Sequence, residues 1–246
     1  MAEYETIRSV GAGTRAAQID QGLRAYMNKV YGLMSVGTLL TGGVAWAVGS
    51  SPALLSIFRN PETLQPNILG WIVMFAPLAM VFMFGSVMRR ASAAGAQLFF
   101  YSYAAVMGLS MAWIFAAFTG ESIATTFFVT AIAFAGTSLY GYVTKRNLSA
   151  MGTFFMMGLI GLLVAMVVNI FLASSALAFA ISVIGVLIFA GLTAYDTQNI
   201  KNTYLEHAQM GDSEWLGKSA IMGALNLYLD FINLFMFLLQ FLGNRE

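Results

Sequence analysis

Cysteine is absent from this chain of 246 residues, and His207 is the only histidine. The lack of cysteine excludes disulfide bonds, thiol nucleophiles and zinc–thiolate sites, although it does not decide the compartment. A single histidine excludes a metal site built from several histidines. These absences favour a protein without catalytic residues or a bound cofactor, and we do not expect an enzyme.

Charged residues are also scarce. They make up 9% of the chain, whereas a soluble domain carries about 25%, and hydrophobic residues make up 59%. This composition predicts an integral membrane protein whose surroundings are the lipid bilayer. The net charge is +1 and no basic cluster suits a nucleic acid, so we expect no nucleic-acid partner.

Seven apolar runs are long enough to cross a hydrocarbon core of about 30 Å as helices. They cover roughly residues 30–50, 68–88, 97–118, 123–143, 151–171, 176–199 and 219–242. The sequence therefore predicts an all-α membrane protein with a single seven-helix domain over residues 26–246. A flexible cytoplasmic tail is expected over residues 1–25, and this tail lacks the apolar core of a cleavable signal peptide.

The distribution of lysine and arginine predicts the orientation. If the N-terminus is cytoplasmic, ten of these residues lie in inner segments and only two, Arg59 and Arg245, in outer segments. This bias agrees with the positive-inside rule, so the C-terminus is expected outside. Two connections are long: the outer one over residues 51–67 is expected to form an irregular lid. The inner one over residues 200–218 is expected to be a solvated linker, with a regulatory contact as the alternative.

The run over residues 219–242 carries a polar face. At about 100° per residue, Gly223, Asn226, Asp230, Asn233 and Gln240 fall within an arc of roughly 100°. A carboxylate near the bilayer midplane is costly in lipid, so this face should point toward protein or water. We therefore expect the other helices to enclose this last span.

Asp196, at the inner end of the sixth run, is a second carboxylate beside the hydrophobic layer. The sixth and seventh runs are antiparallel neighbours, so Asp196 and Asp230 can meet. Like charges close together in a poorly solvated site cannot both ionise cheaply, so the pair would share a proton and could sense pH. The alternatives are an interfacial cap at Asp196 and a structural role for Asp230 beside Asn226 and Asn233.

The same pair could bind a cation weakly. Without its proton it offers up to four oxygens, whereas calcium prefers about six to eight. Asp196 and Asp230 therefore predict a transit site for calcium rather than a storage site.

Four other charged residues are candidates for a role in the site. Arg89 and Arg90 end the second run on the side of Asp196, and either could pair with it, although adjacent basic residues are also an ordinary topology signal. Glu62 and Glu121 lie on the outer side and could attract cations. Glu121 could equally stabilise the first turn of a helix.

The two aspartate motifs together resemble the Bax-inhibitor family, the transmembrane Bax inhibitor motif proteins, in its bacterial branch. The resemblance covers essentially residues 20–246. The matching stretches are Gly191-Leu-Thr-Ala-Tyr-Asp-Thr-Gln198 and Ala224-Leu-Asn-Leu-Tyr-Leu-Asp-Phe-Ile-Asn-Leu-Phe235, with Gly243-Asn-Arg245 and Ser138-Leu-Tyr-Gly-Tyr-Val-Thr-Lys-Arg146 in support.

This resemblance implies a seventh helix wrapped by the other six. It also implies a pH-sensitive calcium leak controlled by an aspartate pair, which corresponds to Asp196 and Asp230, and an arginine of the second span beside the pair, for which Arg90 fits best. A location in the bacterial inner (plasma) membrane follows from the same resemblance.

Three functional hypotheses remain open. The first is a cation leak channel gated by protonation of the aspartate pair. The second is an interaction protein that modulates membrane proteases or stress responses. The third, an intramembrane aspartyl protease, is weakened because Asp230 follows Tyr-Leu rather than the Gly-x-Gly of such enzymes.

Overall fold

The structure, a computed structural model, describes residues 2–60, 62–63, 65–207 and 212–244, and its regular elements over these residues are all helices. Seven helical segments are long and apolar enough to cross a membrane, which confirms the predicted all-α, seven-span architecture. The spans are Gln18–Gly49 within α1 (Ala2–Gly49), α3 (Ile68–Arg90), α4 (Ala93–Met111) with α5 (Ile114–Ala117), α6 (Gly120–Val143), α7 (Ser149–Leu172), α8 (Ser175–His207) and α9 (Ser213–Leu242). The short helix α2 (Pro52–Leu55) lies in the connection between α1 and α3.

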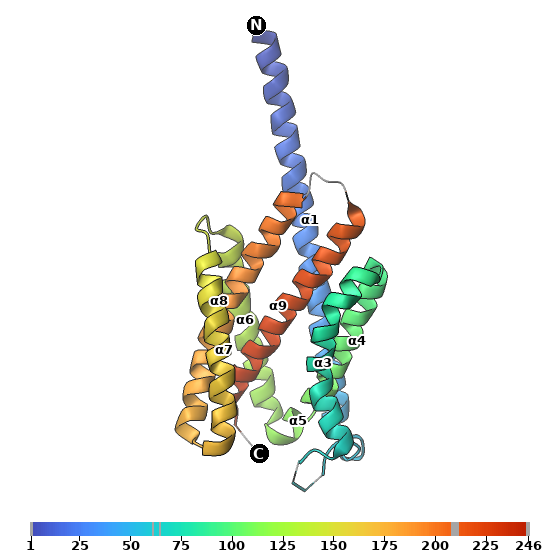
Figure 1. Cartoon of the computed structure of the whole chain (residues 1–246), viewed down its shortest axis with the longest axis vertical. Helices are drawn as coiled ribbons and strands as arrows, with labels where there is room; N and C mark the ends of the chain where they lie inside the picture. Colours follow the sequence, from blue (N-terminus) through green and yellow to red (C-terminus); the bar gives the residue numbers. More distant parts are fainter. Residues whose placement is uncertain (1, 61, 64, 208–211, 245–246) are drawn as a thin grey trace.

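The two chain ends lie at opposite ends of the bundle, as an odd number of spans requires (Figure 1). Which end faces the cytoplasm stays a prediction. Following that prediction, we call the end that carries Arg89, Lys145 and Lys201 the inner end, and the opposite end the outer end.

The packed part of the chain begins earlier than predicted. The backbone is helical from Ala2, and Leu23 lies in the hydrophobic core with 5% of its surface exposed. The predicted boundary at residue 26 is therefore too late, because the first span starts before the apolar run that marked it.

The predicted inner linker over residues 200–218 is wrong over most of its length. Helix α8 continues to His207 and α9 begins at Ser213. Asp212 caps α9 by accepting a hydrogen bond from the Trp215 amide at 2.9 Å, and the rings of His207 and Trp215 stack with centroids 4.1 Å apart. The cap and the stacked rings stabilise helical ends whose residues are polar. Apolar periodicity alone could not predict these ends.

The starts of three further spans are fixed in the same way. A side-chain oxygen accepts a hydrogen bond from a backbone amide of the first turn, which would otherwise lack a partner. The capping residues are Asn67 for α3, Ser92 for α4 and Thr119 for α6.

Helix α9 is the most enclosed span. In its apolar stretch 72% of the residues are buried, against 39% or less in the other spans. It runs obliquely through the middle of the bundle and packs mainly against α1, α4, α6 and α8 (Figure 1). Helices α3 and α7 pack mainly on α4 and α8, respectively. Enclosure of α9 by all six other spans stays a prediction.

The peripheral helices present apolar side chains outward. Phe154, Met157, Ile160 and Phe171 of α7 are all exposed, and α3 exposes Trp71, Phe82 and several other large apolar residues. Contiguous apolar surface of this kind matches lipid tails rather than water.

Candidate functional site

Asp196 of α8 and Asp230 of α9 come together inside the bundle. Their carboxyl groups are close enough to interact electrostatically and as hydrogen-bonding partners. Asp230 is 4% exposed, and its Oδ2 atom is buried without a hydrogen-bond partner in the described part of the chain. Because a hydrogen bond between two carboxyl groups needs a proton on one of them, this contact suits a pair that shares a proton.

The polar face of α9 points toward α8. Gly223 packs against Ile200, and a Cβ atom there would lie 3.0 Å from the isoleucine side chain. At the outer end of the same helix pair, Ser182 Oγ donates to Gln240 Oε1 at 3.4 Å. The contacts at Gly223 and Gln240 lie on either side of Asp230 along α9 and show that this face of α9 packs on α8.

The two asparagines of this face do not complete the pair. Asn233 Nδ2 donates to the carbonyl of Leu229, on its own helix, at 2.8 Å. Asn226 is half-buried and, within the described residues, makes no hydrogen bond to Asp230. The unpartnered Asp230 oxygen is therefore not satisfied by either amide.

A row of hydroxyl groups ends at Thr197, the residue that follows Asp196 in α8. Tyr31 Oη is 2.7 Å from Ser138 Oγ, and Ser138 Oγ is 2.9 Å from Thr197 Oγ1. These three residues come from α1, α6 and α8, and Thr197 directly follows Asp196. The row runs from Thr197 of α8 to the space between α1 and α6.

That space holds a cavity of about 580 Å³ in the inner half of the bundle. Tyr31 and Ser138 line it, together with Arg24, Asn28 and Tyr142. Arg24 and Asn28 are exposed at its inner edge. Apolar side chains, among them those of Met27, Phe134 and Leu139, form most of its remaining surface, so polar groups occupy only part of the cavity.

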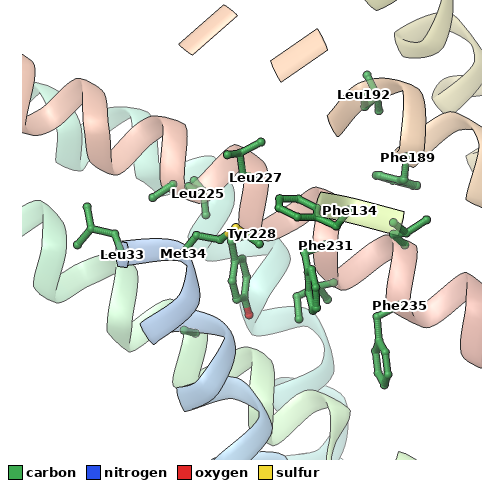
Figure 2. Close-up of a cluster of buried hydrophobic side chains, with 14 of the residues drawn as sticks. Leu33, Met34, Phe134, Phe189, Leu192, Leu225, Leu227, Tyr228, Phe231 and Phe235 are labelled. Carbon is green, nitrogen blue, oxygen red and sulfur yellow. The ribbon is translucent and has the colours of Figure 1, made fainter. Parts of the chain in front are cut away.

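Aromatic rings pack against one another outward of the pair. Phe231 contacts Phe134 edge to face, with centroids 5.6 Å apart (Figure 2). Phe189 stacks on Phe237 with centroids 5.8 Å apart. These residues belong to α6, α8 and α9 and form an apolar layer outward of Asp230. Along α9, Phe231 and Phe237 follow Asp230 toward the outer end.

The outer end carries a polar cavity of about 260 Å³ between the start of α6 and the end of α9. Glu121 lines it, with the hydroxyl-bearing Thr125 and Thr126. Asn244 closes one side, since its N–H donates to Ser122 Oγ at 2.9 Å and its carbonyl accepts from the Thr119 amide at 3.2 Å. The sequence missed this cavity, although Ser122, Thr126, Thr130 and Ser138 recur at multiples of four along α6 and mark the inward face of that helix.

The two acidic residues predicted on the outer side are placed differently. Glu121 lies both in this cavity and in the first turn of α6, so its position fits cation attraction and helix stabilisation alike. Glu62 is exposed in the connection that precedes α3, where its amide donates to Asn60 Oδ1 at 2.9 Å. The structure does not bring Glu62 to the outer cavity.

Arg89 and Arg90 are exposed at the inner end of α3. Neither pairs with Asp196, and in the described ranges the ion pair formed is Lys218 with Glu214, at 3.6 Å. The physical reason is that α3 packs on α4 and not on α8. The contact between a second-span arginine and the pair, implied by the family resemblance, is absent from this arrangement.

The described residues contain no group of three or more histidine, cysteine, aspartate or glutamate side chains that could hold a metal ion. A cation at the pair would therefore meet two carboxyl groups and complete its shell with water or backbone oxygens.

The comparisons with known proteins agree with the membrane fold. The family model described as "Inhibitor of apoptosis-promoting Bax1" matches residues 23–246. The chain is 46% identical to the inner membrane protein YbhL of Escherichia coli over 226 residues, which cover 92% of this chain and 94% of that protein.

Two further relatives are similar over more than nine tenths of their length. An uncharacterized protein of Caulobacter vibrioides is 45% identical over 243 residues, covering 97% of this chain and 96% of the relative. An uncharacterized protein of Rickettsia prowazekii is 46% identical over 228 residues, covering 92% of each. With a family model over nearly the whole chain and relatives of this similarity, the seven-span protein described above belongs to the Bax-inhibitor family of membrane proteins.

Proposed function

We propose that this protein is a pH-sensitive leak channel for cations, including calcium, and that protonation of Asp196 and Asp230 gates it. The observation that carries the proposal is the contact between these two carboxyl groups on adjacent antiparallel helices. One oxygen of Asp230 is buried without a partner in the described chain, so the site is poised to bind a proton or a cation.

The shared proton would hold α8 and α9 together. Loss of that proton leaves two like charges, and at about 4 Å and an effective dielectric constant of about 20 their repulsion is about 4 kcal/mol. A second proton would remove the charge-assisted bond instead. Either change biases the helix pair toward separation, so the leak should be smallest at the pH where one proton is shared.

The surroundings of the pair supply the two halves of a route. The inner cavity and the hydroxyls of Tyr31, Ser138 and Thr197 lead from the inner end toward Asp196. The outer cavity with Glu121 lies at the other end, and the aromatic layer around Phe134 and Phe231 stands between. In this proposal the structure is a closed conformation, and separation of α8 from α9 would open the aromatic layer.

The similarity to an inner membrane protein of Escherichia coli supports a location in a bacterial inner membrane. The lysine and arginine distribution supports a cytoplasmic N-terminus and an outer C-terminus.

The test is calcium flux into liposomes that contain the purified protein, measured across a pH series. Asp196→Asn and Asp230→Asn should each change the flux and flatten its dependence on pH. Asp20→Asn is the matched control, because Asp20 is exposed on α1 away from the pair. Wild-type flux and pH profile in both pair variants would refute the proposal.

The same purified protein can be used to test two alternative functions. The exposed faces of α3 and α7 could bind a membrane protease, and crosslinking that recovers such a partner in stoichiometric amount, with no flux from the purified protein, would favour that function. Two carboxyl groups in contact are also the arrangement of an aspartyl protease. Cleavage of a helical substrate, abolished by Asp196→Asn, would favour that third function.

A further inference from the structure

A second polar cavity lies at the inner end, between the α6–α7 connection and α8. Its volume is about 210 Å³. Three cationic side chains line it, those of Lys145, Arg146 and Lys201, together with the amides of Asn147, Gln198 and Asn202. No acidic side chain contributes to the lining.

The charges of this cavity are not neutralised within the described protein. Its one described ion pair, Lys218 with Glu214, belongs to α9 and involves none of the three. Cations gathered without a counterion repel one another, and an anion bound among them removes that repulsion.

The connection that carries Lys145 and Arg146 is fixed in place. Gln198 Oε1 accepts a hydrogen bond from the Leu148 amide at 2.8 Å, and Gln198 Nε2 donates to the Arg146 carbonyl at 2.8 Å. Leu148 is buried, with 2% of its surface exposed, and anchors the connection between the helices. The two basic side chains therefore extend from a rigid backbone, which lowers the ordering cost of binding.

Lys201 is oriented as well. Its Nζ donates to the Tyr142 carbonyl at 2.8 Å and lies 5.3 Å from the centre of the Tyr142 ring. An ammonium group held in this way keeps further donors for a ligand, since lysine has three.

We infer that this cavity is a binding site for a phosphate group. Its volume is below the range of about 300–1,000 Å³ typical of sites for drug-sized ligands, so it suits a single small anion rather than a whole nucleotide. A guanidinium, two ammonium groups and side-chain amides are the donors that recognise phosphate oxygens. The phosphate could belong to an anionic lipid headgroup, because the cavity lies where α6 leaves the apolar layer, or to free phosphate. The inference does not depend on the proposed leak.

The experiment uses the full chain in two arms. In detergent, inorganic phosphate is titrated against chloride of equal ionic strength, and binding is measured by calorimetry. In nanodiscs, retention of phosphatidylglycerol is compared with that of phosphatidylcholine by native mass spectrometry. We expect saturable binding of one phosphate group per chain in at least one arm. Binding of inorganic phosphate identifies a free anion site, whereas binding confined to phosphatidylglycerol identifies a headgroup site.

Two double variants test the site, because each removes two positive charges from a different place on the inner end. Lys145→Gln/Arg146→Gln should weaken binding at least tenfold, and Lys201→Gln should weaken it as well. Arg89→Gln/Arg90→Gln, at the inner end of α3, should leave it unchanged. Lys145, Arg146, Arg89 and Arg90 are exposed, so these double changes spare the core. Absence of saturable binding in both arms, or an equal loss in the α3 control, would overturn the inference.

Discussion

The hydroxyl groups of Tyr228 and Thr41 lie 2.7 Å apart and fix α9 against α1, two residues before Asp230. Thr41 Oγ1 is also within hydrogen-bond distance of the carbonyls of Ala104, at 2.8 Å, and Gly37, at 3.0 Å. Because Thr41 has one proton to give, Tyr228 donates to Thr41 and Thr41 donates to a carbonyl. One hydroxyl thus joins α1, α4 and α9 (Figure 2 shows Tyr228 near Met34 of α1).

Tyr228→Phe should lower the free energy of unfolding by about 1 kcal/mol. The change removes one buried hydrogen bond, while Thr41 keeps its carbonyl partner and is not left unsatisfied. Tyr101→Phe is the control, because the Tyr101 hydroxyl makes no hydrogen bond within the described residues. Equilibrium denaturation in detergent measures both, and equal effects would show that the hydroxyl contact contributes nothing specific.

Gly141→Ala should lower stability by about 1–3 kcal/mol, as overpacking does in a tight interface. Gly141 of α6 lies against the backbone of Ala194 on α8, where a Cβ atom has no room. Gly136, on the same helix, has no neighbour within 4 Å of the position that a Cβ would take. Gly136→Ala should therefore be neutral or stabilising by up to about 1 kcal/mol. Thermal unfolding of the two variants side by side checks the contrast, and a loss at both positions would contradict it.

Asp196 and Asp230 should behave as a unit if the proposed gate is correct. Either single change to Asn removes the shared proton, so the double variant should flatten the pH profile of calcium flux no further than one single variant does. Residues that act together show this kind of non-additivity. Flux profiles of the wild type, both single variants and the double variant complete the cycle. Additive effects would show that the two carboxyl groups act independently.

Glu121→Gln should reduce calcium flux several-fold at low ionic strength and less at high salt. The carboxylate lines the outer cavity, and a surface charge raises the local concentration of cations only until salt screens it. Glu62→Gln is the matched control, because Glu62 does not line that cavity. Flux measured with both variants at two ionic strengths tests the expectation, which fails if the two variants respond alike.

Much of the fold could be predicted because it follows from long apolar runs. Such runs predict the seven spans, and the polar face of the last run predicts an enclosed α9, which is buried over most of its apolar stretch. The pairing of Asp196 with Asp230 could be anticipated because the sixth and seventh runs are consecutive and antiparallel, which makes their helices neighbours. Their role in gating stays a prediction.

The parts that escaped prediction depend on contacts between distant residues. The helical continuation to His207 rests partly on its stacking against Trp215 across the α8–α9 connection, which apolar spacing does not encode. The position of Arg90 depends on which helix α3 packs against. No local sequence pattern shows that this helix is α4. The row formed by Tyr31, Ser138 and Thr197 draws on three separate spans.

The attachment of Asn244 to the start of α6 sets how α9 could move. Its two hydrogen bonds, to Ser122 and from Thr119, would both break if the outer end of α9 slid along α6. A sideways swing of the inner half of α9 about that end would keep both bonds and would break the Tyr228–Thr41 contact and the Tyr26–Ser219 hydrogen bond instead. In such a lever, displacement grows with distance from the pivot, so Asp230 and the residues inward of it would travel farther than Gln240.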